Sequence, residues 1–508
     1  MNGENQKRSA LEKIKEKLDT GALQSFFMGK WFPIVAAALI LFGHTFGIEV
    51  YLCFVYMLLI TLGVIVCDSV RPIIIALCAF TYQVSMQNTP GGPVWSDAYT
   101  SGVSPYFIAL ISAMIVADLI YIIIKFKVFS GLSFSKTPLL LSMSILGAAF
   151  LLNGAFSAHW EFADLLYGAL QAFLFPFIFL LFYKGLKNEK DMEELGLYVS
   201  YVAAVMGVIL ALEMAYLYCF GGGYFPTIFN SDGSVIKERI HLGWATWNPA
   251  GACMSILIPA IFYGVMKGRH PVLYFGAATL TYVAALLTLS RNAMIFATLA
   301  YFGSVLIACF FAEKTRRTIF RVCVFLGILG AAFFVIVFFG EIKVLAKDVF
   351  DRGFSDNGRF GVWAVAVNNF KSAPVFGTGF YHFTAPILHN LSPAIPLMAH
   401  QTFLQLLSSM GVVGLGAYLY YRFDTLEMFV KKPTLLKTML GLSALTLLLG
   451  SLLDNFIFII FPTFFYGVVL AVSAIIFERQ NEDERSSMGA SKKSKNKKAS
   501  NKRGKSGK

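Results

Sequence analysis

The sequence PYFIALISAMIVADLIYIIIK, which occupies positions 105–125, decides the fold class because it is almost entirely apolar over about 20 residues. A run of that length matches the hydrocarbon thickness of a bilayer, and an α-helix satisfies its main-chain polar groups in lipid. Similar runs recur along the chain, so we predict an all-α, polytopic transmembrane bundle of about 12 to 14 spans. The candidate spans are 32–47, 48–67, 72–88, 105–125, 138–154, 164–183, 195–220, 249–266, 271–289, 293–311, 322–340, 401–421, 438–453 and 456–477.

The composition of the whole chain agrees with a membrane protein. Of 508 residues, 57% are hydrophobic and 14% are charged, whereas soluble domains carry about 25% charged residues. The seven cysteines lie in or beside apolar runs without a CxxC pair or a metal-binding spacing. Soluble, β-barrel and disulfide-rich secreted proteins are therefore excluded.

The basic residues behind the net charge of +13 are distributed as expected for a membrane topology rather than for a nucleic-acid-binding surface. If the N-terminus is cytoplasmic, the cytoplasmic side carries 34 of the 42 Lys and Arg residues, as the positive-inside rule expects. We therefore predict that both termini are cytoplasmic and that the chain binds no nucleic acid. The predicted parts are a cytoplasmic segment 1–31, a transmembrane domain 32–477, and a basic, disordered cytoplasmic tail 478–508 attracted to membrane lipids.

Eight basic residues fall on the opposite, extracytoplasmic side, where the positive-inside rule disfavours them. Most belong to two long segments between spans, 221–249 and 341–400. Because long connecting segments are often functional, we expect the chemistry there. The eight residues are Lys237, Arg239, Arg291, Lys343, Lys347, Arg352, Arg359 and Lys371.

A short helix is predicted from Arg359 to Lys371 within the segment 341–400. An Asp-Asn-Gly sequence can cap its start, and Pro374 follows its end. Arg359 then stands at the helix N-terminus, where free backbone N–H groups and a guanidinium together attract phosphate. The alternative is an interfacial helix with Trp363 on its apolar stripe, in which Arg359 merely reaches into water.

The stretch after this helix contains Pro374, Gly377 and Gly379. Such a turn-rich passage allows the backbone to approach a ligand closely.

Three further residues at extracytoplasmic span ends are candidates for the same site. Arg291 is costly at the membrane boundary unless it faces a cavity or an anionic group, although snorkelling to water is the alternative. Arg239 could instead pair with Glu238 at an exposed position. His400 begins a span and could be structural, but on the same side as three arginines it could orient or deprotonate an acceptor hydroxyl.

These residues stand in sequences that resemble the O-antigen ligase and polymerase family. The similarity spans residues 237–420, and Gln401 and Ala250 stand where that family more often has Asn. The resembling stretches are Arg239 to Pro249, Ser290-Arg291-Asn292-Ala293, Gly358 to Trp363 with Phe370, Pro374, Gly377 and Gly379, and His400 to Gln405 with Gly411 and Gly414.

The resemblance implies a metal-independent membrane glycosyltransferase without a cofactor, working in cell-surface polysaccharide biosynthesis at the bacterial plasma membrane. Its donor would be a glycan on polyprenyl diphosphate, of the undecaprenyl type, and its acceptor a hydroxyl on a glycan, lipid or protein. By the same resemblance, Arg239, Arg291 and Arg359 would hold the diphosphate at the outer leaflet. Trp363 would contact the substrate, and His400 would serve the acceptor.

A transporter, such as a flippase of lipid-linked glycans, is the alternative function. It would need ionisable residues deep in the bundle and pseudo-symmetric halves. Asp118 and Glu213 fall within predicted spans, but no internal repeat is visible, and the long segment 341–400 lies in one half only. A structural scaffold is a third possibility, although it leaves the extracytoplasmic arginines unexplained.

Overall fold

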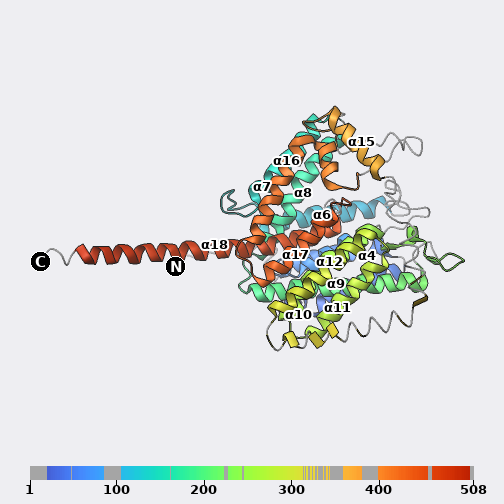
Figure 1. The fold of residues 1–508 in the computed structure, drawn as a ribbon, viewed down its shortest axis with the longest axis horizontal. Coiled ribbons are helices and arrows are strands. Elements are labelled where there is room, and N and C mark those ends of the chain that lie inside the picture. Colours follow the sequence, from blue (N-terminus) through green and yellow to red (C-terminus); the bar gives the residue numbers. More distant parts are fainter. Residues whose placement is uncertain are drawn as a thin grey trace, which may run out of the picture.

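The computed structural model in Figure 1 is built almost entirely from helices. It describes residues 20–46, 48–84, 104–158, 160, 162–221, 227–242, 245–312, scattered residues between 314 and 343, 359–379, 399–455 and 460–503.

The described N-terminal part of the chain is mainly helical. Its helices are α2 (Thr20–Met28), α3 (Trp31–Phe46), α4 (Glu49–Val66), α5 (Ile73–Val84), α6 (Pro105–Lys125), α7 (Leu140–Phe156), α8 (Phe162–Leu186) and α9 (Met192–Phe220).

The C-terminal part opens with a short 3-10 helix and an antiparallel ribbon of two strands, which lead directly into a long helix. Its elements are η1 (Lys237–Arg239), β1 (His241–Leu242), β2 (Ala245–Thr246), α10 (Trp247–Lys267), α11 (Pro271–Leu287), α12 (Arg291–Phe311), α15 (Arg359–Ser372), α16 (Thr402–Val430), α17 (Leu435–Gly450) and α18 (Ile460–Arg503).

Local sequence signals explain where several helices begin. Proline occupies the first turn of α6 and α11, where its missing N–H has no intrahelical partner to lose. Polar side chains open four other helices by accepting a backbone N–H of the first turn. These caps are Asp191 for α9, Ser290 for α12, Gln401 for α16 and Thr434 for α17.

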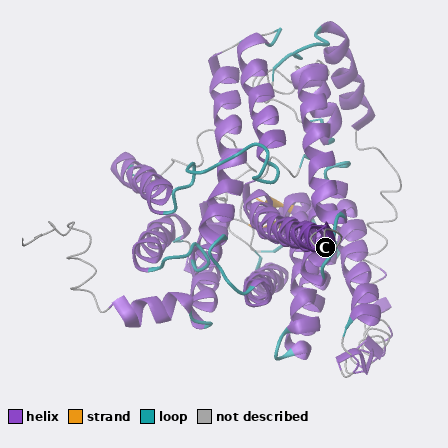
Figure 2. Ribbon diagram, turned by 90° about the vertical axis from the view of Figure 1, so that its left-hand side faces the viewer, coloured by secondary structure: helices purple, strands orange, loops and turns teal. Residues whose placement is uncertain are grey.

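The described residues contain seven helices that are long and apolar enough to cross a membrane. The pair α2 and α3, bent by 68°, passes the same test when taken together, and five further apolar helices are shorter. The predicted fold class, an all-α polytopic bundle, is confirmed, and Figure 2 shows helices throughout. The predicted span 322–340 lies mostly outside the described residues.

The core of the bundle lies around α10, which is buried over nearly its whole length by α9, α11, α12 and α17. A second group, in which α7 packs between α8 and α16, lies on the other side of α18 in Figure 1. Helix α15 packs on α16 in this second group. Helix α18 contacts both groups, through α8 and α16 on one side and α10 and α17 on the other.

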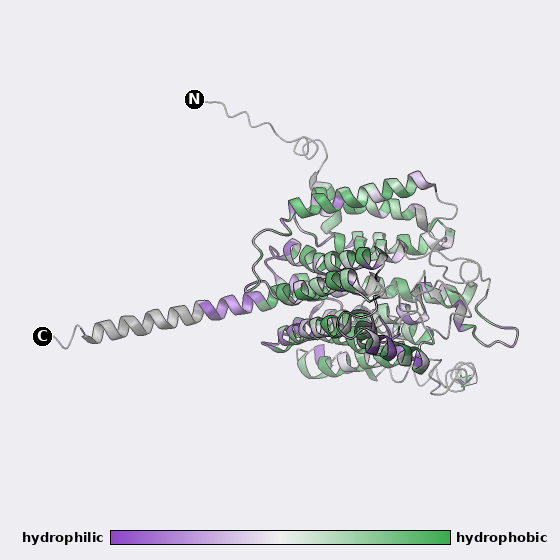
Figure 3. Cartoon of the chain, turned by 90° about the horizontal axis from the view of Figure 1, so that it is seen from above, coloured by the Kyte–Doolittle hydropathy of each residue, from purple (hydrophilic) through white to green (hydrophobic). Residues whose placement is uncertain are grey.

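The last helix, α18, runs through Arg503 and leaves the bundle in Figure 1. The disorder predicted for residues 478–508 stays a prediction. The stretch 478–503 contains no proline and many Glu, Lys and Arg residues, which are good helix formers. Figure 3 shows the change from hydrophobic to hydrophilic residues where this helix leaves the bundle.

Charged side chains gather at the end of the bundle from which α18 leaves, which we call the basic end. Lys187 Nζ pairs with Glu478 Oε1 at 2.8 Å, and Lys432 Nζ pairs with Glu484 Oε2 at 2.6 Å. Arg71 Nη1 likewise pairs with Glu194 Oε1 at 2.9 Å. These contacts bring together residues that the charge pattern assigns to one side, and their cytoplasmic orientation stays a prediction.

Candidate functional site

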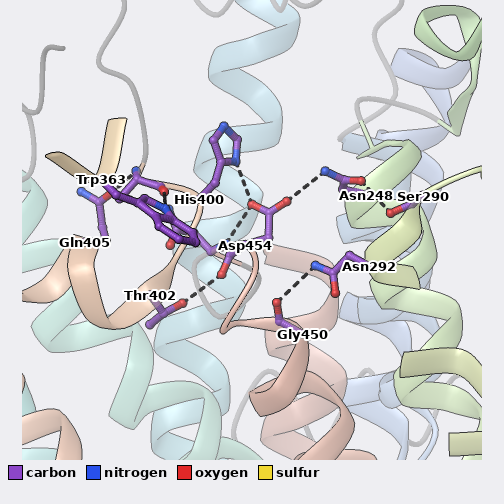
Figure 4. Close-up of polar contacts among 11 residues, drawn as sticks. Asn248, Ser290, Asn292, Trp363, His400, Thr402, Gln405, Gly450 and Asp454 are labelled. Atoms are coloured by element: carbon purple, nitrogen blue, oxygen red, sulfur yellow. Dashed lines mark hydrogen bonds and ion pairs between the residues drawn. The ribbon is translucent and has the colours of Figure 1, made fainter. Parts of the chain in front are cut away.

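At the opposite end of the bundle, polar side chains from separate segments meet at the ends of several helices, as Figure 4 shows. Asn248 lies at the start of α10, Ser290 caps α12, His400 precedes the cap of α16, and Asp454 follows α17. We call this group the His400 cluster. Helix ends supply it because their backbone groups and caps are already polar.

Asp454 is the centre of the His400 cluster. Its Oδ1 lies 3.1 Å from His400 Nδ1 and accepts the backbone N–H of Asn455 at 2.9 Å. Its Oδ2 accepts from Asn248 Nδ2 at 3.1 Å. The carboxylate is 11% exposed while the imidazole is 44% exposed, so Asp454 is enclosed and His400 faces outward.

The cluster continues from Asp454 to the first turn of α12. Ser290 Oγ donates to Asn248 Oδ1 at 2.6 Å and also accepts the backbone N–H of Ala293 at 3.3 Å. The next residue but one, Asn292, donates through Nδ2 to the carbonyl of Gly450 at 3.2 Å. These bonds tie the start of α12 to α10 and to the end of α17.

The backbone at His400 is fixed by its neighbours on both sides. His400 adopts a left-handed φ of 50°, which is uncommon for a residue other than glycine. Ala399 donates its N–H to Gln405 Oε1 at 2.7 Å and accepts from Trp363 Nε1 at 2.9 Å. Thr402 donates its N–H to Ser451 O at 3.0 Å, which brings the start of α16 to the segment carrying Asp454.

The arginines predicted for the site lie at the ends of helices or in the segment that precedes α10. Arg291 is the first residue of α12, directly after Ser290, and is partly exposed. Arg359 is the first residue of α15, as predicted, and is also partly exposed. Trp363 stands one turn further along α15 and holds the residue before His400. The structure therefore joins Trp363 and the neighbours of Arg291 to His400.

Arg239 is placed differently, in the segment that leads to α10. It lies in η1, and its Nη1 donates to the carbonyl of Thr227 at 3.0 Å. The same segment contains a turn in which the hydroxyl and backbone N–H of Ser234 donate to Asp232, which lowers the pKa of that carboxyl. Arg239 supports this segment, and its contact with a diphosphate stays a prediction.

The glycines after α15 serve a different purpose from the one we expected. We predicted that Gly377 and Gly379 let the backbone approach a ligand, but the close neighbours are protein atoms. A Cβ on Gly377 would lie 2.2 Å from the carbonyl carbon of Ser409, and one on Gly379 would lie 2.8 Å from the carboxylate of Asp164. The passage instead crosses α16 at Gly411, where the helix is kinked.

The carboxylate of Asp454 and the amide of Asn248 were not predicted as functional. In the sequence, Asp454 only separates two apolar runs, and it follows His400 by 54 positions. One signal was available, because an acid between two apolar runs needs a partner that compensates its burial. Within the part of the chain that the structure describes, no three His, Cys, Asp or Glu side chains are arranged to hold a metal ion.

Comparison with known proteins supports the resemblance seen in the sequence. Residues 276–419 match the family described as O-antigen ligase, which supports assignment to the O-antigen ligase and polymerase family. Arg291, Arg359, Trp363 and His400 lie within the matched residues, whereas Asp454 follows them. A search of curated proteins found no match.

Proposed function

From the O-antigen ligase match of residues 276–419, we propose that the protein transfers or polymerises glycan at the extracytoplasmic face of the membrane. The donor is a glycan linked to polyprenyl diphosphate, and the acceptor is a hydroxyl group of a glycan, lipid or protein. The reaction needs no metal. Two observations at helix ends support this reading, one for each substrate.

For the acceptor, the observation that carries the proposal is the pairing of His400 with Asp454. A carboxylate only accepts hydrogen bonds, so the contact of 3.1 Å requires the imidazole proton to be on Nδ1. The lone pair of Nε2 is then left to accept a proton from a hydroxyl. Because the imidazole is 44% exposed, an acceptor can reach it from outside the bundle.

For the donor, Arg291 and Arg359 each stand at the first position of a helix. Free backbone N–H groups and a guanidinium in one place favour a bound phosphate, and they stabilise the negative charge that develops on it when its ester bond breaks. Arg239 adds a third guanidinium on the segment before α10. The face of Trp363 offers an aromatic surface to a sugar.

The transfer proceeds by exchange of one bond for another. The acceptor oxygen attacks the anomeric carbon while its proton passes to Nε2 of His400. The bond between that carbon and the phosphate oxygen breaks, and the polyprenyl diphosphate leaves with the electron pair. No oxidant, reductant or nucleotide is consumed, because the donor is already activated by its diphosphate.

The test is product analysis with the full chain in sealed vesicles that contain a polyprenyl-diphosphate-linked glycan and a soluble acceptor. We expect a new glycosidic bond and released polyprenyl diphosphate, with unchanged rates after a divalent-ion chelator is added. Movement of the intact donor across the membrane without a new bond would support the transporter instead. A strict need for a divalent ion would contradict the metal-free reaction.

An experiment in cells distinguishes a ligase from a polymerase. Removal of a ligase leaves full-length chains on the lipid, whereas removal of a polymerase leaves single repeat units. The glycan that accumulates when the protein is deleted therefore identifies which of the two reactions it performs.

A further inference from the structure

We propose that Asn248 and Ser290 are positioning residues that set the direction of hydrogen bonding through Asp454 and thereby fix which nitrogen of His400 is the base. This inference rests on the proposed function, because it assigns partners to the proposed base. It concerns side chains that lie behind the imidazole, since Ser290 is fully buried and Asn248 is partly buried.

The series of hydrogen bonds that leads to His400 begins at the first turn of α12. The backbone N–H of Ala293 donates to Ser290 Oγ at 3.3 Å, as expected for a helix cap. The hydroxyl proton is therefore available for a second contact, and Asn248 Oδ1 lies 2.6 Å away. An amide oxygen is an acceptor, so Ser290 donates and Asn248 accepts.

The amide of Asn248 accepts from Ser290 on one side and donates to Asp454 on the other. With Oδ1 engaged by Ser290, the Nδ2 group faces Asp454 Oδ2 at 3.1 Å and donates to it. Rotating the amide by half a turn would place its oxygen against the carboxylate and would leave two acceptors in contact. Such a contact is unfavourable in an enclosed site, so the serine selects one amide orientation.

At Asp454 the donors converge on a single carboxylate. Oδ2 is occupied by Asn248, and Oδ1 accepts from the backbone of Asn455 at 2.9 Å. These two bonds hold the plane of the carboxylate, with Oδ1 facing His400 Nδ1 at 3.1 Å. The imidazole is therefore held with its proton on Nδ1 and with Nε2 free.

The arrangement also connects the two substrates of the proposed reaction. Ser290 is directly followed by Arg291, which we assign to the diphosphate of the donor. The same helix end would thus bind the donor and orient the base that serves the acceptor. A residue that only supported the fold would not need to link the donor site to the base.

The experiment measures kcat and KM for donor and acceptor with the full chain in vesicles, using Asn248→Ala, Ser290→Ala, Ser290→Thr and the double variant Asn248→Ala/Ser290→Ala. We expect Asn248→Ala to lower kcat by about tenfold to hundredfold while both KM values stay within about twofold. Ser290→Thr keeps the hydroxyl and should restore most of the rate lost in Ser290→Ala. Because Ser290 acts through Asn248, the double variant should be no slower than Asn248→Ala alone.

A matched control separates positioning from stability. Thr434 caps α17 at the other end of the bundle by accepting from Lys437 N at 3.2 Å, so Thr434→Ala removes a helix cap without touching the cluster. We expect Thr434→Ala and Ser290→Ala to lower the thermal unfolding temperature similarly, with kcat reduced only in Ser290→Ala.

Three results would overturn the inference. The first is a folded Asn248→Ala protein with the wild-type kcat. The second is a kcat in Ser290→Thr that is lowered as much as in Ser290→Ala. The third is a double variant in which the losses of kcat from the two single variants multiply. If His400→Ala also transferred glycan at the wild-type rate, the proposed base itself would be wrong. Inactive His400→Ala with fully active Asn248→Ala would leave the proposed function standing and remove only the positioning role.

Discussion

The two ends of the bundle use polar side chains in different ways. At the basic end, Lys187 and Glu478 are 41% and 13% exposed, and Arg71 and Glu194 are 12% and 63% exposed. Each of these ion pairs has one partner that is 41% exposed or more. At the His400 cluster, several donors converge instead on one carboxylate that is 11% exposed.

The difference indicates what each end does. Exposed ion pairs contribute about 0–1 kcal/mol each, so those of the basic end mainly fix where α18 and the neighbouring loops leave the bundle. Several donors that converge on one enclosed carboxylate fix the orientation of the hydrogen bonds around it. An ion pair that only holds a helix in place needs no such orientation. We therefore expect substitutions at the two ends to change different measured quantities.

Removing the guanidinium groups near the His400 cluster is expected to have a large effect on transfer, exceeded only by the loss of His400 itself. Arg291→Ala and Arg359→Ala should each lower transfer by about 100-fold to 1,000-fold, because each removes a donor to the charge that develops on the diphosphate. The measurement is the rate of transfer in reconstituted vesicles, with folding checked by thermal unfolding.

Lys371→Ala is the matched control for Arg359. It removes a positive charge from the last turn of the same helix, α15, where the side chain is exposed. Transfer by Lys371→Ala should stay near the wild-type rate. Equal losses in Arg359→Ala and Lys371→Ala would mean that the overall charge of the helix matters rather than its N-terminal arginine.

A smaller effect, on stability, is expected where the passage after α15 crosses α16. Gly411 has a φ of 63°, and a Cβ added there would lie 2.4 Å from Val375 O. Gly411→Ala should lower the free energy of unfolding by about 1–3 kcal/mol, measured as a lower midpoint in a denaturant titration. Gly416→Ala, in the same helix with open space around it, should leave the stability unchanged or raise it by up to about 1 kcal/mol.

The smallest effect is expected at the basic end. Lys187→Ala removes one partner of Glu478, which still accepts from Tyr183 OH at 2.7 Å. The change in unfolding free energy should be below about 1 kcal/mol, and the rate of transfer should not change. A large loss of transfer in this variant would contradict the separation of the two ends.

The sequence predicts the helices well because lipid imposes length and hydrophobicity on each of them. The span predicted at 105–125 coincides with α6, and the helix predicted from Arg359 coincides with α15 within a residue. Lys187 and Lys432, two of the basic residues that the charge pattern places on one side, also lie at one end of the structure. The disorder of the tail stays a prediction, because its composition suits a solvated helix as well as a disordered chain.

The candidate site was predicted only in part, for a physical reason. His400 could be selected from the sequence because it begins a span on the side of the unusual arginines. Asp454 and Asn248 could not be paired with it, since their contacts depend on how α10, α16 and α17 pack together. Charge patterns assign a residue to one side of a membrane, but only packing determines its hydrogen-bond partner.

The most direct test of the central claim is the single-turnover rate of glycan transfer by His400→Ala, compared with the wild-type chain, at saturating donor and acceptor. We expect the rate to fall by about 100-fold to 10,000-fold because the general base is lost, while donor binding is retained through the arginines. A folded His400→Ala protein that forms the glycosidic bond at the wild-type rate would contradict the account.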